Sequence, residues 1–388
     1  MTESPSSHRT LNVIDLARSF SILAVLANHL GPNYLTRPSA SPFWARVWFK
    51  LWANGHYGVP IFFVISGYLI TRVLAGQPKG LFHPDFRDFY SRRVGRILPL
   101  LVLTVLLDLF LVRVCSPLSP QYLFCFSDPQ TSLNPVLWAS IAFFSMNWYL
   151  MSPLAAHAKS LMVAWTILWS LSIEEQFYLF YPLWLSRLGR PKALLAGLAF
   201  FIALGPTLKW VGWTWFFRDG WFSLNSFCYF GLIALGGLLY WTAETYRDFL
   251  LRPKVSGPLC LAGFLLTLNT YSHVVLRADF FGNVWADYFI GLGTFLFLLG
   301  GMNLGFFESK SWRRLGAPGR MSYGMYLLHP LVLFVIWPWL KGLNDFMAFA
   351  FFAAATFAVA RLSYQFFEFP VNQWIRRRFG VKSSPRPA

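Results

Sequence analysis

Charged residues are scarce in this chain. Asp, Glu, Lys and Arg together make up 13% of its 388 residues, whereas apolar residues make up 56%. Because soluble domains carry about 25% charged residues, this composition excludes an ordinary set of soluble domains. Acidic residues are the scarcest of all, with 16 against 33 basic residues and a net charge of +17. We therefore expect a protein whose solvent is the lipid bilayer.

Cysteine is rare as well, and its placement excludes several kinds of site. Cys115, Cys125, Cys228 and Cys260 show no CxxC spacing and no clustered histidine, so neither a zinc site nor a redox pair is indicated, and we expect no metal. Cys115 and Cys125 fall in a predicted outer loop, where a disulfide and two free thiols both remain open. The basic residues lie in short clusters between apolar runs, so we expect no nucleic-acid partner.

Long apolar runs are the dominant feature of the sequence. A helix needs about 20 apolar residues to cross the hydrocarbon core, and ten runs approach that length. They are 11–31, 56–76, 97–114, 164–186, 193–210, 226–243, 257–274, 284–304, 321–340 and 346–367. The apolar segment 136–150 is shorter and is bounded by prolines, which predicts a re-entrant or interfacial helix. We therefore predict an all-α integral membrane protein with about ten transmembrane helices.

The basic residues predict how these helices are oriented. With the N-terminus inside and ten spans, 22 of the 33 basic residues fall in inner segments, which is the positive-inside pattern. Both termini are then cytoplasmic in a multi-pass plasma membrane protein. We expect a cytoplasmic N-terminal segment at 1–10, a transmembrane domain at 11–370, and a basic, disordered cytoplasmic tail at 371–388.

The first predicted span carries ionisable residues, which are costly in a membrane and point to function. Arg18 and His29 are eleven positions apart, so both project from one helix face at depths that differ by about 16 Å. Such a helix lines a polar path at two levels. Alternatively, Asp15 neutralises Arg18 one turn away, and His29 is merely interfacial.

Two further segments carry chemistry. Arg92, Arg93 and Arg96 stand at the inner entry of the third span, where guanidinium groups suit a phosphorylated ligand, although a basic cluster also serves as a topology anchor. Glu174 and Glu175 are adjacent carboxylates at membrane depth. Either one orients a catalytic group, or both act as counter-ions to Arg18 or to His329, which precedes a proline in the ninth predicted span.

In their order along the chain, these segments resemble the membrane acyltransferase-3 family, whose members O-acetylate cell-surface glycans and related acceptors. The resemblance covers roughly Leu11 to Pro370. It rests on five motifs in this order: Arg18 separated by ten residues from His29, the stretch GVPIFFVISGYLI, Arg93-x-x-Arg96, WSLSIEEQFY and SYGMYLLH. It implies an O-acyltransferase that takes an acyl group, most simply acetyl, from cytoplasmic acyl-CoA and passes it to a hydroxyl of an extracytoplasmic carbohydrate.

The resemblance also implies roles for the candidate residues. Arg93 and Arg96, with Arg92 beside them, hold the nucleotide end of acetyl-CoA, and Arg18 steadies the pantetheine arm or a carbonyl group. His29 is the general base, and Glu174 or Glu175 orients it. A covalent acyl-enzyme on His29 or Ser170 stays open. Some members of the family carry an extra SGNH-type domain after the membrane portion. This sequence ends at Ala388 without one, and we therefore expect the chain to act on its acceptor directly or with a separate partner.

Two other classes of protein remain open. A secondary transporter or glycan exporter also places Arg, His and Glu along an intramembrane path. A non-catalytic membrane scaffold would use the same residues for packing. Binding of CoA separates the enzyme from the transporter, and loss of activity on changing His29 alone separates it from the scaffold.

Overall fold

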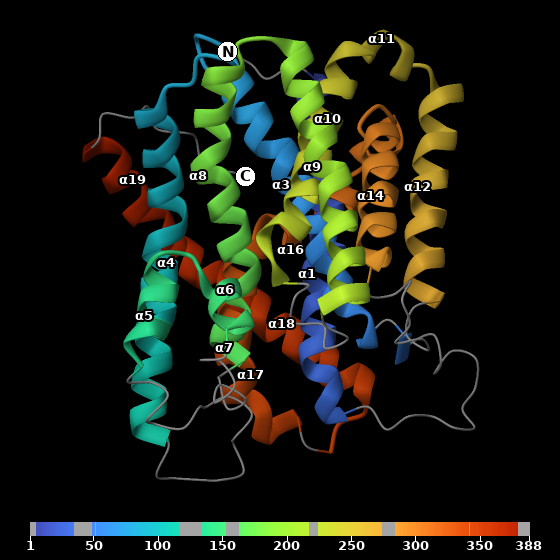
Figure 1. The fold of residues 1–388 in the computed structure, drawn as a ribbon. Coiled ribbons are helices and arrows are strands. Elements are labelled where there is room, and N and C mark those ends of the chain that lie inside the picture. Colours follow the sequence, from blue (N-terminus) through green and yellow to red (C-terminus); the bar gives the residue numbers. More distant parts are fainter. Residues whose placement is uncertain are drawn as a thin grey trace.

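The structure is a computed structural model that describes residues 5–34, 49–50, 52–115, 134–152, 163–216, 224–273, 284–340 and 342–378. Within these ranges the regular elements are helices, and no strand occurs among them. Most of the long helices run roughly along one common direction (Figure 1). The all-α prediction is confirmed for the described part of the chain.

The ten predicted spans all fall on long helices. These are α1 (Pro5–Tyr34), α3 (Gly58–Ala75), α4 (Phe86–Cys115), α8 (Leu168–Leu188), α9 (Pro191–Val211), α10 (Ser226–Thr245), α12 (Pro253–His273), α14 (Ala286–Gly301), α17 (Ser322–Leu340) and α18 (Asp345–Ser363). The shorter elements are η1 (Gly55–Tyr57), α5 (Pro135–Ala142), α6 (Met146–Met151), α7 (Val163–Thr166), η5 (Gly212–Phe216), α11 (Arg247–Leu250), η8 (Gly305–Glu308), α15 (Lys310–Leu315), α16 (Ala317–Arg320), η9 (Tyr364–Glu368) and α19 (Phe369–Arg378).

By the length and hydropathy of the observed helices, fewer of them qualify as membrane spans than the sequence predicted. Among the described residues, seven helical stretches are long and apolar enough to cross a membrane, and they fall on α1, α3, α4, α9, α10, α17 and α18. Helix α14 is apolar but has only 16 residues, and α8 carries two glutamates and a glutamine in its middle. The total of about ten spans and the cytoplasmic location of both termini stay predictions.

The segment 136–150 does not form one continuous helix. It folds into α5 and α6, which have 8 and 6 residues. Between them Phe144 adopts a positive φ of 50°, a conformation that is rare for a residue with a side chain. Since neither helix reaches the length of a span, the prediction that this segment does not simply cross the membrane is consistent with the fold.

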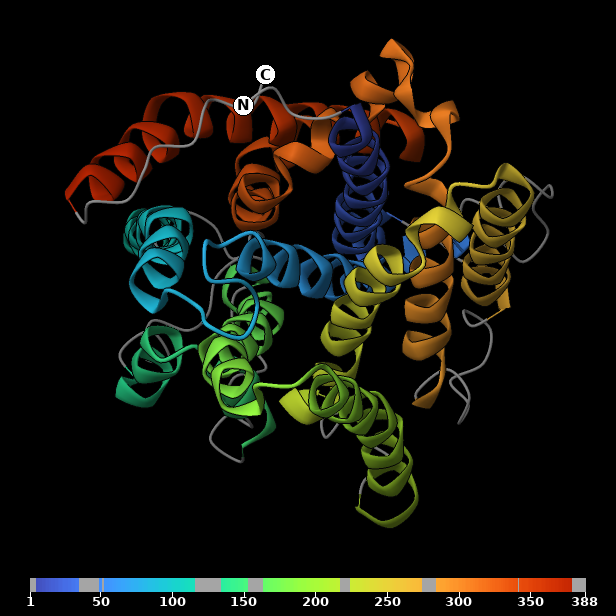
Figure 2. The ribbon, with the colours of Figure 1, turned by 90° about the horizontal axis from the view of Figure 1, so that it is seen from above.

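Helix α3 lies at the centre of the bundle. It contacts α1, α8, α10 and α14, and Figure 2 shows it running among them when the molecule is seen from above. At its crossing with α10, a Cβ added to Gly67 would lie 1.8 Å from the Ile233 carbonyl oxygen, and one added to Gly236 would lie 2.0 Å from the Val64 carbonyl oxygen. Glycine therefore lets the two backbones touch, as small residues do in membrane helix pairs.

The C-terminal segment departs from its prediction. Residues 371–378, expected to begin a disordered tail, belong to α19, which packs against α4. Asn372 lies against Gly95 of α4, so this contact orders residues that composition alone marked as a tail. Residues 379–388 lie outside the described residues.

The cysteines that the structure describes are not bridged. Cys228 and Cys260 are buried free thiols. The proposed alternatives for Cys115 and Cys125 concern side chains outside the described residues, and both alternatives stay open.

Candidate active site

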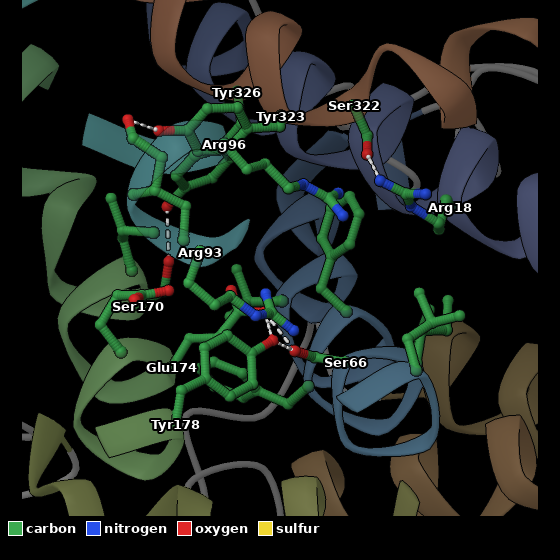
Figure 3. A pocket seen from close by; sticks show the side chains of 18 residues that line it. Arg18, Ser66, Arg93, Arg96, Ser170, Glu174, Tyr178, Ser322, Tyr323 and Tyr326 are labelled. Atoms are coloured by element: carbon green, nitrogen blue, oxygen red, sulfur yellow. Dashed lines mark hydrogen bonds between the residues drawn. The ribbon is translucent and has the colours of Figure 1, made fainter. Parts of the chain in front are cut away.

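An open cavity of about 840 Å³ lies among α1, α3, α4, α8 and α17. All five quoted motifs contribute residues to it, three of them charged ones, brought together from distant parts of the chain (Figure 3). Its polar lining residues are Arg18, Ser66, Arg93, Arg96, Ser170, Glu174, Glu175, Tyr178, Ser322, Tyr323 and Tyr326.

Arg93 and Arg96 reach the cavity from α4, as their spacing predicted. The guanidinium carbon of Arg93 lies 3.9 Å from the ring centroid of Tyr178, a cation–π contact. No carboxylate of the described residues lies within 4.0 Å of either guanidinium. Two cations without a bound counter-ion therefore face one cavity, which favours an anionic ligand there.

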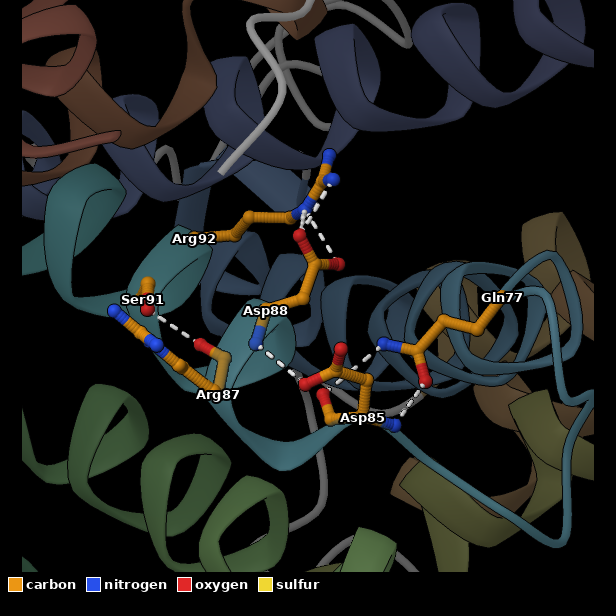
Figure 4. Close-up of polar contacts among 6 residues, drawn as sticks. All are labelled: Gln77, Asp85, Arg87, Asp88, Ser91 and Arg92. Atoms are coloured by element: carbon orange, nitrogen blue, oxygen red, sulfur yellow. Dashed lines mark hydrogen bonds and ion pairs between the residues drawn. The ribbon is translucent and has the colours of Figure 1, made fainter. Parts of the chain in front are cut away.

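Arg92 does not share this arrangement, and its place in the nucleotide site stays a prediction that the geometry of this cavity does not support. Its guanidinium pairs with Asp88 at 2.7 Å and is not among the cavity-lining residues. Asp88 in turn lies beside Asp85, whose carboxylate accepts a hydrogen bond from the Asp88 backbone at the start of α4 (Figure 4). Adjacent helical residues point about 100° apart, and Arg92 points towards Asp88 while Arg93 lines the cavity.

The two glutamates of α8 line the same cavity as the arginines. The Glu174 carboxylate accepts hydrogen bonds from the hydroxyl groups of Ser66 and Tyr178. The Glu175 Oε1 atom is buried and has no hydrogen-bond partner in the part of the chain that the structure describes. Both carboxylates thus lie in the same cavity as Arg18, Arg93 and Arg96, without an ion pair to Arg93 or Arg96 among the described residues.

Arg18 enters the cavity from α1, and its guanidinium donates a hydrogen bond of 2.8 Å to the Ser322 hydroxyl at the start of α17. Asp15 is near enough to Arg18 to attract it electrostatically, but no ion pair within 4.0 Å joins the two among the described residues. Asp15 instead pairs with Arg320 at 3.5 Å. Arg18 therefore keeps its charge available to the cavity.

His29 lies near the opposite end of α1 and has a partner that the sequence did not predict. Its Nδ1 atom is 3.0 Å from Nε2 of His329 in α17, and the two rings stack with centroids 4.8 Å apart. No hydrogen bond or ion pair joins His29 to Glu174 or Glu175 among the described residues, and both glutamates line the cavity that Arg18 enters; an orienting role for either of them stays a prediction. Eleven residues of helix separate Arg18 from His29 by about 16 Å, too far for one carboxylate to contact both.

Tyr326 joins the cavity to the histidine pair. Its ring lines the cavity, and its hydroxyl is 2.7 Å from the Ser170 hydroxyl and donates to the Ile167 carbonyl at 2.6 Å. Its own carbonyl oxygen is 2.7 Å from Nδ1 of His329. The polar groups therefore continue from the basic cavity towards His29.

Comparison with known protein families decides the class of this chain. Residues 11–364 match the model of an acyltransferase domain. The chain belongs to this acyltransferase family. The match covers all the motifs discussed above and ends before α19. No solved structure matches the chain.

Curated relatives of this acyltransferase chain are found among bacterial O-acetyltransferases. The O-acetyltransferase OatA of Staphylococcus aureus is 25% identical over 387 residues, covering 95% of this chain and 58% of the relative. The putative peptidoglycan O-acetyltransferase YrhL of Bacillus subtilis is 27% identical, covering 94% and 55%. The peptidoglycan O-acetyltransferase OatA of Listeria monocytogenes is 28% identical, covering 95% and 56%. The chain thus spans a little over half the length of these relatives.

Several residues of the acyltransferase site were not predicted individually. Ser66, Tyr178, Ser322 and Tyr326 line the cavity and hydrogen-bond across it, and His329 contacts His29. Each of them lies inside one of the motifs that carried the family resemblance. Polarity within an apolar run was the available signal, and it did not say which partner each side chain would meet.

Proposed function

We propose that this chain is a membrane O-acyltransferase that moves an acyl group, most simply acetyl, from cytoplasmic acyl-CoA to a hydroxyl of an extracytoplasmic carbohydrate. The main support for the proposal is that two residues of the single helix α1 lie in two separate sites. Arg18 lies in a cavity with Arg93 and Arg96, which have no carboxylate partner among the described residues, and His29 lies about three turns away in a histidine pair. Separate sites at two depths suit a donor and an acceptor that come from opposite sides of the membrane.

The donor is acyl-CoA in this proposal. Arg93 and Arg96 bind its phosphate groups, since guanidinium forks make strong charge-assisted bonds with phosphate oxygens. The positive-inside pattern places the start of α4, and with it this basic entrance, on the cytoplasmic side, where acyl-CoA is made available. The pantetheine arm then extends past Arg18 and Tyr326, and the thioester reaches His29.

The chemistry at His29 is a direct transfer. His29 accepts the proton of the acceptor hydroxyl as the hydroxyl oxygen attacks the thioester carbonyl carbon. The new oxygen–carbon bond forms, the carbon–sulfur bond breaks, and the CoA thiolate leaves and takes up the proton from His29. Atoms and charge balance, because an alcohol and a thioester yield an ester and a thiol.

The acceptor is a carbohydrate hydroxyl of peptidoglycan in this proposal. Two of the relatives above carry peptidoglycan O-acetyltransferase in their names, and the third is named an O-acetyltransferase. The likeness to the region shared with those proteins supports a similar acceptor.

The test uses purified chain in nanodiscs with radiolabelled acetyl-CoA and soluble peptidoglycan fragments. We expect wild type to bind acetyl-CoA and transfer acetyl groups. The double change Arg93→Ala/Arg96→Ala weakens acetyl-CoA binding by about tenfold or more, since each lost hydrogen bond to a charged group contributes about 1.5 kcal/mol or more. Arg92→Ala is the matched control, and it leaves the affinity within about twofold because its partner is a surface carboxylate.

His29→Ala completes the design. It keeps the affinity for acetyl-CoA but lowers kcat by about 100-fold or more, the usual effect of losing a general base. Folded wild type without affinity for acetyl-CoA would overturn the donor assignment and leave transport as the function to pursue. Equal losses of affinity from Arg92→Ala and the double change would show that general surface charge, rather than the cavity, binds the donor.

A further inference from the structure

His329 is buried, with 0% of its surface exposed, and lies 300 positions after the histidine that it contacts. The short distance between Nε2 of His329 and Nδ1 of His29 requires one proton between two nitrogen atoms. Which nitrogen carries that proton decides which atom of His29 is left free to act as a base.

Pro330, the residue after His329, determines which nitrogen of the His329 ring carries the proton. In a helix, the N–H of residue 330 would donate to the carbonyl of residue 326. Residue 330 is a proline and has no N–H, so the Tyr326 carbonyl is left without its usual helical donor. Nδ1 of His329 takes this place, 2.7 Å from the Tyr326 oxygen. A carbonyl oxygen only accepts hydrogen bonds, so the His329 proton lies on Nδ1.

The tautomer of His29 then follows from the chemistry of neutral imidazole. With its proton on Nδ1, His329 presents a lone pair at Nε2. The proton between the two rings must then lie on Nδ1 of His29, and Nε2 of His29 is left unprotonated. We infer that His329 is a positioning residue that holds His29 in the tautomer whose Nε2 atom is the base, and that Pro330 sets this arrangement by freeing the Tyr326 carbonyl.

This inference rests on the proposed function and gives the His29 step a second participant. The hydroxyl proton moves to Nε2 of His29, and the resulting imidazolium donates from Nδ1 to the neutral His329. His329 thereby takes the orienting role that a carboxylate fills in hydrolase triads. The proton returns from Nε2 of His29 to the CoA thiolate, and His329 neither gains nor loses a proton.

A direct measurement of the tautomers tests the inference without any assay of transfer. The chain contains 7 histidines, so ¹⁵N-histidine labelling of the protein in nanodiscs gives few signals, and His29→Gln and His329→Gln assign two of them. We expect both His29 and His329 in the Nδ1–H form at neutral pH. A His329 ring with its proton on Nε2 would overturn the inference whatever the enzyme's activity.

Two kinetic comparisons separate positioning from simple packing. Pro330→Ala restores an N–H that competes with His329 for the Tyr326 carbonyl, and we expect kcat to fall about tenfold with KM for acetyl-CoA unchanged. Pro338→Ala, at the other proline within α17, is the control and keeps kcat. His329→Gln retains an acceptor towards His29 and should be at least about tenfold more active than His329→Leu, which has none.

The outcomes distinguish this inference from the proposed function. If wild type transfers acetyl groups while Pro330→Ala and His329→Leu, both folded, keep its kcat, the positioning role fails and the function stands. If wild type transfers nothing, the proposed function fails, and the tautomer measurement still decides how the two rings are arranged.

Discussion

The guanidinium of Arg93 lies over the ring of Tyr178, 3.9 Å from its centroid, and the hydroxyl of the same tyrosine hydrogen-bonds to Glu174. One aromatic side chain thus contacts a cation with its face and an acid with its edge. Because α4 supplies the arginine and α8 supplies the tyrosine and the glutamate, this contact positions the basic side of the cavity relative to the acidic side.

Replacing Tyr178 tests whether its ring positions Arg93. Tyr178→Leu removes the ring, and since a cation–π contact contributes about 0.5–2 kcal/mol, we expect the KM for acetyl-CoA to rise by about twofold to 30-fold. Tyr178→Phe keeps the ring and should leave KM within about twofold. Steady-state transfer in nanodiscs measures both. Equal effects of the two changes would show that the hydroxyl, through Glu174, is what matters.

The crossing of α3 and α10 should not tolerate a methyl group. Gly67→Ala and Gly236→Ala each place a Cβ about 2 Å from a backbone oxygen, and separating two packed helices costs about 1–3 kcal/mol. We expect a lower melting temperature and a lower yield of folded protein for both.

Gly257→Ala serves as the control for this prediction. It adds a Cβ in α12 with nothing within 4 Å, so its melting temperature should stay the same or rise, since alanine favours a helix by about 1 kcal/mol over glycine. If Gly67→Ala is as stable as Gly257→Ala, the close crossing is not a feature of the folded protein in membranes.

The ion pair between Lys209 of α9 and Asp287 of α14 is buried, and the ammonium also lies 4.4 Å from the ring centroid of Tyr229. Removing one charge leaves the other unpaired. Lys209→Met or Asp287→Asn should therefore lower stability by about 3–5 kcal/mol, measured by thermal or denaturant unfolding in a reconstituted membrane.

The double change Lys209→Met/Asp287→Leu removes both charges and should recover much of that loss, because an apolar pair of similar volume replaces a buried ion pair at little cost. A double variant with the summed loss of the two single changes would show that the charges do not depend on each other.

Much of the helical framework was predictable from the chain itself. Apolar runs of the length of a span predicted the long helices because a membrane helix must satisfy its backbone hydrogen bonds internally. The short apolar segment around Phe144 was predicted not to cross simply, and it forms two short helices. The helical structure of residues 371–378 was less predictable. These residues belong to α19, which is ordered by its contact with α4, and such a contact cannot be predicted from composition.

The sequence predicted which residues form the site better than it predicted which of them contact one another. The periodicity of a single helix placed Arg18 and His29 on one face at two depths, and spacing within α4 placed Arg93 and Arg96 together. That local geometry needs no tertiary information. Only the packing of α1 against α17 paired His29 with His329, and Asp15 with Arg320 in the neighbouring α16. The sequence determined which side chains are polar within the membrane, and the relative rotation and depth of distant helices, set by packing, decided which of them meet.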